Sequence, residues 1–187
     1  QVMEEAVMAG MPVLLLSAGQ AGATAPAAIA GAIAQALAEV IAGLIYVNAM
    51  KPGHPCIVGT WPFVSDLRTG AMSGGSGEQG LLTAACAQML QYYNLPGGAA
   101  SGMADSKMPD AQSGYEKGST LVMAGLSGLN MVYEAAGMHA SLLGFCLESL
   151  IIDNDMLGQC LRCVRGIEVS DQTIGIQVMK DLCMGGP

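Results

Sequence analysis

Short apolar runs alternate along this chain with longer stretches of helical periodicity, and this alternation constrains the fold more than any other feature. The runs are about five residues long and almost uncharged, which is typical of strands in a buried parallel sheet. We expect strands at 11–17, 56–60, 98–101 and 130–134. The sequence therefore predicts an α/β fold of parallel (β/α) units whose strands are buried on both faces.

Helices are expected between and after these strands, at 2–8, 21–47, 78–93, 110–126, 141–152 and 156–164, and again after Ser170. Pro109 and Asp110 mark one helix start, because proline suits the first turn and an acidic side chain complements the helix dipole. Ser170 and Asp171 supply another cap.

The length of the chain limits the number of such units. A closed barrel of eight (β/α) units typically needs ~250 residues, so 187 residues hold about half of one. The chain also starts at Gln1, inside an expected helix, so we expect residues 1–187 to be a partial TIM-barrel domain of a longer polypeptide. An open doubly wound sheet of four strands is the alternative, but no phosphate-binding fingerprint supports it.

Composition excludes some classes of partner. The net charge of -8 argues against nucleic acid, which normally requires a basic face. The six cysteines occur without a recognisable secretory leader, so we expect a reducing compartment, the cytoplasm.

Two stretches invite interpretations that we do not favour. Ala21 to Val47 is long enough to cross a bilayer, but it contains Gln35 and Glu39 and lacks a flanking cluster of Lys and Arg. A buried amphipathic helix and no membrane is our prediction. Cys160 and Cys163 form a C-x-x-C that would bind zinc together with Cys146 or Cys183, yet buried cysteines acting as small hydrophobic residues explain them better. We predict no metal.

Polar residues gather between Gly102 and Thr120, in the loop expected to leave a strand and enter a helix. In parallel α/β folds, ligands and catalytic groups collect in the loops at the carboxyl ends of strands. This loop is the first candidate for a site. The glycine-rich run from Gly70 to Gly80 precedes another helix, where its amides would bind an anion or form a flexible loop.

Three stretches together resemble the trimethylamine methyltransferase family of corrinoid-dependent methyltransferases. They are Trp61 to Glu78 (WPFVSDLRTGAMSGGSGE), Gly102 to Thr120 (GMADSKMPDAQSGYEKGST), and Gly137-Met138 with Leu147 to Asp153 (LESLIID). The resemblance extends over nearly the whole chain in the same order. Family members are TIM barrels much longer than this chain, in agreement with the partial barrel expected above.

The resemblance implies transfer of a methyl group from a methylated amine to the reduced cobalt of a corrinoid (cobalamin) on a separate corrinoid protein. Neither His54 nor His139 has an aspartate two residues before it, as a D-x-H-x-x-G cobalt-ligand motif requires, so we expect the cofactor on that partner and none bound covalently here. Trimethylamine enzymes of the family carry pyrrolysine, which is absent from these residues. The pyrrolysine-free branch, with glycine betaine and related betaines as substrates, is therefore favoured, and a trimethylamine-specific enzyme is the alternative.

The resemblance also suggests roles for the polar and aromatic residues near the strand ends, because aromatic faces and carboxylates bind quaternary ammonium groups. A cage wall is expected from Trp61, Phe63 and Tyr115; a counter-charge from Asp66, Asp105, Asp110 or Glu134; a partner for a betaine carboxylate from Arg68 or Lys107; and a polar lining from His139.

A structural role is the alternative for each candidate. Trp61 would pack under a loop, Asp66 with Arg68 and Asp105 with Lys107 would form local ion pairs, and His139 would be a satisfied buried histidine. Glu116 is expected to face solvent.

Two rival functions remain open: a non-catalytic module that binds betaines or a partner, and an ordinary metabolic α/β enzyme. Because a half barrel exposes sheet edges, we also expect a homo-oligomer.

Overall fold

A parallel sheet of four strands forms the centre of the molecule. The computed structural model describes the backbone of residues 1–183 and the side chains of residues 1–182. The strands are β1 (Val13–Ser17), β3 (Cys56–Thr60), β6 (Gly97–Ala100) and β7 (Met131–Tyr133), in the order β1-β3-β6-β7. All three neighbouring pairs are parallel, which confirms the predicted (β/α) units.

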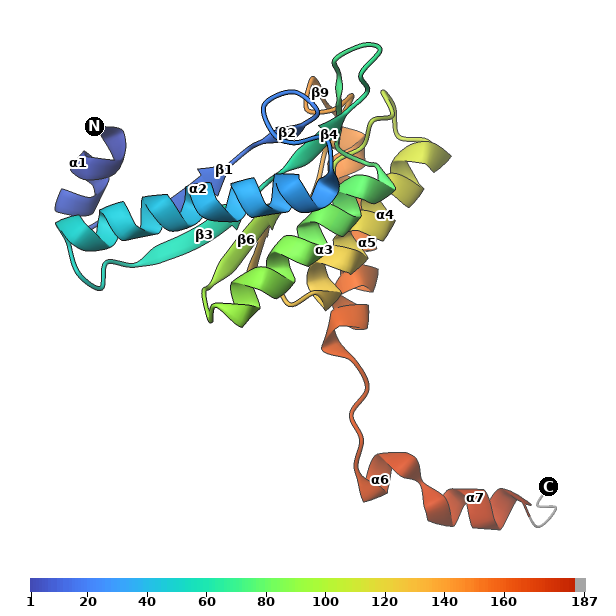
Figure 1. Cartoon of the computed structure of the whole chain (residues 1–187). Coiled ribbons are helices and arrows are strands. Elements are labelled where there is room, and N and C mark those ends of the chain that lie inside the picture. Colours follow the sequence, from blue (N-terminus) through green and yellow to red (C-terminus); the bar gives the residue numbers. More distant parts are fainter. Residues whose placement is uncertain (184–187) are drawn as a thin grey trace.

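Helices connect these strands and cover one face of the sheet (Figure 1). They are α1 (Val2–Met8), α2 (Ile29–Met50), α3 (Gly77–Tyr92), α4 (Ala111–Leu126), α5 (Leu147–Arg165), α6 (Asp171–Ile174) and α7 (Ile176–Cys183). Helix α2 packs on β1 and β3, α3 packs on β3 and β6, and α4 lies between α3 and α5. The last two helices lie away from the rest, beyond an extended segment (Figure 1).

The two faces of the sheet differ in burial. Leu15 and Val58 point toward the helices and are 6% and 0% exposed, packed with side chains of α1, α2 and α3. On the opposite face Leu14, Leu16 and Met131 are 42%, 50% and 41% exposed. The expectation of strands buried on both faces is therefore wrong for the described residues. A closed barrel fills its inner face with side chains from all its strands, so four strands leave that face open.

Short strands that the sequence did not predict stand at the carboxyl end of the sheet. One small sheet contains β2 (Gln20–Ala21), β4 (Phe63–Ser65) and β5 (Met72–Ser73), and a hairpin contains β8 (Met138–His139) and β9 (Gly144–Phe145). Strands of two or three residues are too short to give a periodic signal.

The predicted helices at 141–152 and 156–164 are wrong in their bounds. Residues 141–145 belong to the β8–β9 hairpin, and a single helix, α5, runs through the supposed break. Asp153, Asn154 and Asp155 lie inside this helix, where Asp153 is 3% exposed and pairs with the buried Lys117.

Helix α2 is the one helix within residues 1–183 that is long and apolar enough, by length and composition alone, to cross a membrane. Its buried residues, Ala32, Ala36, Leu37, Val40 and Val47, lie on one side. These residues pack on the sheet and on α1 and α3.

Two glycines in the segment from Gly102 to Thr120 give a matched test of this backbone. Gly102 has a φ of +88°, and a Cβ there would lie 3.0 Å from the Ala135 carbonyl oxygen. We expect Gly102→Ala to lower the free energy of unfolding by about 1–3 kcal/mol. Gly114 lies inside α4 with nothing within 4 Å of a built Cβ, so Gly114→Ala is expected to raise it by about 0.5–1 kcal/mol. Urea unfolding measures both, and equal effects would refute the backbone constraint at Gly102.

Candidate functional site

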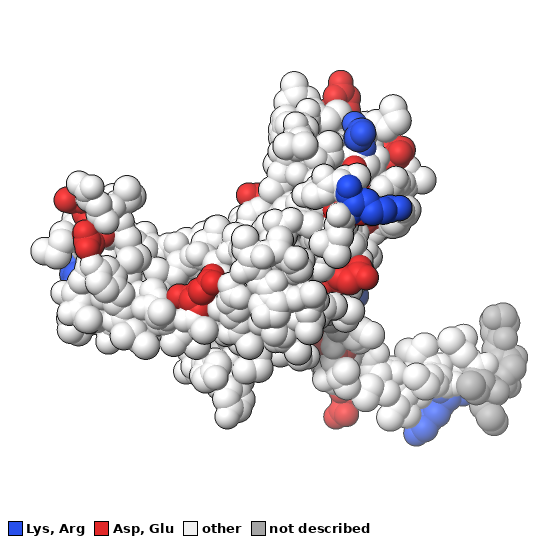
Figure 2. Space-filling view, turned by 45° about the horizontal axis from the view of Figure 1, so that its top comes forward, with Lys and Arg blue, Asp and Glu red and all other residues white. Residues whose placement is uncertain are grey.

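Three connecting segments enclose a cleft of about 570 Å³ at the carboxyl end of the sheet. They are the β4–β5 hairpin, the loop from β6 to α4 and the turn of the β8–β9 hairpin. The cleft brings together four predicted site residues, Asp66, Arg68, Asp105 and Lys107. On the face shown in Figure 2, Lys and Arg side chains form no continuous basic patch.

Asp105 links the loops at the carboxyl end of the sheet. Its carboxylate accepts hydrogen bonds from the Ser73 hydroxyl (2.6 Å), the Gly74 and Gly75 amides (2.7 and 3.3 Å) and the Ser141 hydroxyl (2.8 Å). The amides of Gly74 and Gly75 in the glycine-rich run thus bind a carboxylate of the protein itself. The expected ion pair with Lys107 is not among those formed by the described residues.

Asp66 and Arg68 form the local ion pair considered as the structural alternative. Arg68 Nε lies 3.1 Å from Asp66 Oδ1, and the Thr69 hydroxyl donates to Asp66 Oδ2. The hydrogen bonds from Arg68 lower the pKa of the Asp66 carboxyl. Lys107 is exposed in the neighbouring loop, and none of the ion pairs of the described residues includes it.

Asp110 is the N-cap of α4, as the sequence predicted. Its carboxylate accepts from the Ser113 amide (2.9 Å) and the Ser106 hydroxyl (2.8 Å). These bonds, led by the Ser113 amide, lower the pKa of Asp110. The side chain thus satisfies one of the free amides at the helix start.

Two of the three predicted aromatic residues lie together. Trp61 directly follows β3, and its ring centroid is 5.9 Å from that of Phe63, at an interplanar angle of 47°. The Trp61 indole N–H is buried and has no acceptor among the described residues. Tyr115 is 65% exposed on α4 and forms no ring pair with either.

Glu134 follows β7 in an unusual backbone conformation for a residue other than glycine, with a φ of +62°. Its side chain is exposed, and partial desolvation by the surrounding residues raises the pKa of the carboxyl. The neighbouring Tyr133 has a buried hydroxyl without a partner among the described residues. Burial and the nearby Glu134 carboxylate raise the pKa of Tyr133, so its hydroxyl stays protonated. Sequence reasoning missed Tyr133, although its place at the end of a strand was a signal.

His139 belongs to a buried polar network and is 2% exposed. Its Nδ1 lies 3.2 Å from the Ser106 carbonyl oxygen, and its Nε2 contacts the Ser149 hydroxyl and lies 3.4 Å from Lys117 Nζ. Both ring nitrogens are therefore engaged within the protein. This arrangement matches the satisfied buried histidine of the structural alternative.

Lys117 and Asp153 form the ion pair of this network, and sequence reasoning missed it. Lys117 is 0% exposed, and its Nζ lies 2.6 Å from Asp153 Oδ2, which also accepts from the Gly137 amide at 2.7 Å. The pair joins α4, α5 and the start of the β8–β9 hairpin.

Glu116 was expected to face solvent, and this expectation is wrong. It is 6% exposed and accepts hydrogen bonds from the Asp105 and Ser106 amides (2.8 and 3.3 Å) and from the Gln112 amide group. The buried face of α4 consists largely of polar residues: Ser113, Glu116, Lys117 and Thr120. A polar stripe normally indicates a solvent-exposed face.

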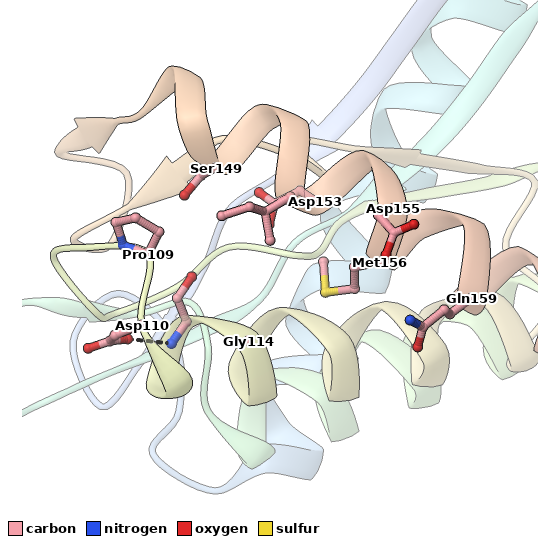
Figure 3. A pocket seen from close by; sticks show the side chains of 10 residues that line it. Pro109, Asp110, Gly114, Ser149, Asp153, Asp155, Met156 and Gln159 are labelled. Atoms are coloured by element: carbon pink, nitrogen blue, oxygen red, sulfur yellow. Dashed lines mark hydrogen bonds between the residues drawn. The ribbon is translucent and has the colours of Figure 1, made fainter.

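A smaller cavity of about 290 Å³ lies between the start of α4 and α5 (Figure 3). Asp110, Asp153 and Asp155 line it, and the first two already accept hydrogen bonds from the protein. Cys56, Cys86, Cys146, Cys160 and Cys163 are free thiols. Within the part of the chain that the structure describes, no group of three His, Cys, Asp or Glu residues forms a metal site. The side chain of Cys183 lies outside the described residues.

The buried ion pair predicts a large loss of stability when one partner is removed. Lys117→Met leaves the Asp153 carboxylate buried and unpaired, so we expect the free energy of unfolding to fall by about 3–5 kcal/mol. Lys117→Met combined with Asp153→Asn should cost less than the sum of the single variants, because the charges are coupled. Chemical denaturation of the three variants tests this, and additive effects would contradict the coupling.

The four hydrogen bonds to Asp105 predict a structural effect that Asp66 does not share. Asp105→Ala leaves partly buried donors unpaired, with an expected loss of about 1–3 kcal/mol in the free energy of unfolding and faster proteolysis near Ser73 and Ser141. Asp66→Ala, which removes an exposed pair, should change both measurements little. Equal sensitivity of the two variants would contradict the role of Asp105.

Comparison with known proteins gives the family of the chain. The glycine betaine methyltransferase of Desulfitobacterium hafniense (strain Y51) is 35% identical over 178 residues, covering 95% of this chain and 37% of that protein. The trimethylamine methyltransferase MttB of Methanosarcina thermophila is 34% identical over 185 residues, covering 99% of this chain and 38% of that protein. The sequence profile described as Trimethylamine methyltransferase (MTTB) matches residues 1–187, so the chain belongs to the trimethylamine methyltransferase family.

Proposed function

We propose that the protein containing this chain transfers a methyl group from a methylated, quaternary amine to the Co(I) of a corrinoid carried by a separate protein. The observation that carries the proposal is the family match over all 187 residues. The chain spans 37–38% of the length of the relatives compared above, so the activity of the whole protein is inferred from this part.

Identity alone does not choose the amine. The glycine betaine and trimethylamine relatives are 35% and 34% identical to this chain. The ordinary amino acids throughout these residues, with no pyrrolysine, favour a quaternary amine such as glycine betaine over trimethylamine. A trimethylamine-specific enzyme is the alternative substrate assignment.

The chemistry requires positioning more than proton transfer. The Co(I) electron pair forms a bond to the methyl carbon, the carbon–nitrogen bond breaks, and the nitrogen keeps that bonding pair and leaves as a neutral tertiary amine. No general acid is needed. The protein must hold the cation and direct one methyl group toward the cobalt. The aromatic pair Trp61–Phe63, just after β3, offers aromatic faces to a cation, and the exposed Glu134 carboxylate, just after β7, offers a counter-charge.

Residues 1–187 form, in this proposal, part of a TIM-barrel domain whose remaining units cover the open inner face of the sheet. In this proposal the corrinoid stays on its own protein, because neither His54 nor His139 stands in a D-x-H-x-x-G motif. We further propose a homo-oligomer in the cytoplasm. The five free thiols among the described residues agree with a reducing compartment.

Methylation of cob(I)alamin tests the proposal directly. The full-length protein is mixed with cob(I)alamin and with trimethylamine, glycine betaine, carnitine or proline betaine in turn, and the absorbance of methylcobalamin is followed. We expect methylation by one or more quaternary amines and none by trimethylamine. A reaction without protein is the control. Binding of a betaine without methylation would indicate a non-catalytic binding module, and methylation by trimethylamine alone would indicate the alternative substrate.

A further inference from the structure

The turn of the β8–β9 hairpin has a strained backbone. Ala140, Ser141 and Leu142 follow one another with φ angles of +50°, +53° and +72°. Residues with a Cβ enter this left-handed region at a cost in free energy, and they normally do so singly. Such strain persists only where surrounding contacts enforce it, and it is typical of segments that clamp or switch at functional sites.

Contacts with the loop after β6 hold the turn in this conformation. The Ala140 amide donates to the Ser106 carbonyl at 2.9 Å, and the Ser141 amide donates to the Ala104 carbonyl at 3.1 Å. The Ser141 hydroxyl donates to Asp105 Oδ1 at 2.8 Å. The bond to Asp105 has a charged acceptor and is therefore the strongest of the three. Strain and hydrogen bonds oppose each other here, so the loss of one strong bond favours release of the turn.

The base of the same hairpin is anchored in the buried polar network. The Gly137 amide donates to Asp153 Oδ2 at 2.7 Å, and His139 Nε2 contacts the Ser149 hydroxyl. Asp153, His139 and Ser149 are 3%, 2% and 1% exposed. Opening the base would uncover a buried charge, which is costly. The base is therefore fixed under conditions in which the turn can move.

The turn forms one wall of the cleft at the carboxyl end of the sheet. Ala140, Ser141 and Leu143 line this cleft of about 570 Å³ together with Asp105. Leu143, at the end of the turn, is 89% exposed, so it has little packing to lose when it moves. Displacement of the turn would widen the cleft and leave the apolar core intact.

We propose that the segment from Ala140 to Leu143 is a lid that swings on the fixed base of the hairpin, with Asp105 as the latch that holds it closed against backbone strain. The structure is the closed state, in which the turn is a wall of the cleft. In the open state the left-handed residues relax and the cleft widens. The inference goes beyond the proposed function, which requires a positioned cation and no moving loop.

Amide hydrogen exchange on the full-length protein, without substrate, tests the lid. The tip amides are those of Ala140, Ser141 and Leu143, and the base amides are those of Gly137 and Cys146, each hydrogen-bonded in the closed state. We expect Ser141→Ala, which removes the latch bond, to speed exchange of the tip amides about tenfold. The base amides should exchange at their wild-type rate.

A glycine variant tests the strain by the sign of its effect. Glycine adopts a positive φ without a steric penalty, so Ala140→Gly relieves strain in the closed state. We expect it to slow exchange of the tip amides by about two- to fivefold. An unstrained turn would respond in the opposite way, because glycine adds backbone freedom.

Matched controls come from the same cleft and from a distant helix end. Ala71 lines the cleft in the β4–β5 hairpin without a positive φ, so Ala71→Gly should not slow exchange in its own loop. Ser127→Ala removes a hydroxyl that bonds the Ala124 carbonyl at the far end of α4, and the tip amides should not respond. Thermal unfolding of every variant identifies global loss of structure.

Hydroxyl-radical footprinting reports on the cleft itself. Met72 lines the cleft, whereas Met108 is 61% exposed and does not line it. In Ser141→Ala, Met72 should be oxidised faster than in the wild type, because an open lid exposes the cleft lining. Met108 should be oxidised at the same rate in both proteins.

The outcomes decide the inference independently of methyl transfer, since no measurement uses an amine or a corrinoid. Unchanged tip exchange in Ser141→Ala, or faster tip exchange in Ala140→Gly, would overturn the lid. Tip and base amides that respond equally would also overturn it, because the hairpin would then open as one unit. Faster oxidation of Met72 without a change at Met108 supports the lid, and equal oxidation of Met72 in both proteins refutes it.

Discussion

Two linked carboxylates, those of Glu116 and Asp105, hold together the loops at the carboxyl end of the parallel sheet. Glu116, buried on α4, accepts from the Asp105 amide and so fixes the loop after β6. Asp105 in turn accepts from Ser73, Gly74, Gly75 and Ser141 and fixes the loops that follow β5 and β8. Hydrogen bonds to charged acceptors are stronger than neutral ones. The cleft therefore has preformed walls, since each of its three loops contacts this chain of carboxylates.

Glycine makes these contacts geometrically feasible. A Cβ at Gly75 would lie 2.7 Å from the Glu116 side chain, and one at Gly74 would lie 3.1 Å from Met103. The loop before α3 must approach both Glu116 and the Asp105 carboxylate, and any side chain at Gly75 would hold it away. The glycine-rich run thus reflects close packing around the buried Glu116 and the partly buried Asp105 carboxylates.

The sequence predicted the order and direction of the main strands well, because each is a short apolar run that gives a clear signal. It predicted the start of α4 from Pro109 and Asp110 for the same local reason. It failed where polar residues are buried. Lys117, Glu116 and Asp153 occupy core positions that apolar residues normally fill, and their partners are distant along the chain. Long-range pairs of this kind leave no periodic trace, so a single sequence cannot reveal them.

Hydrogen bonding within the protein also separates the four carboxylates that the sequence offered as counter-charges for a ligand. Asp66, Asp105 and Asp110 were equal to Glu134 as sequence candidates, since all four lie after predicted strands. In the structure the first three accept hydrogen bonds from neighbouring backbone and side-chain groups, and each would have to give up such bonds to serve a ligand. The exposed Glu134 carboxylate has no such bonds among the described residues. A cation bound beside Glu134 would therefore break no contact of the fold, whereas beside the other three it would compete with contacts that hold the fold.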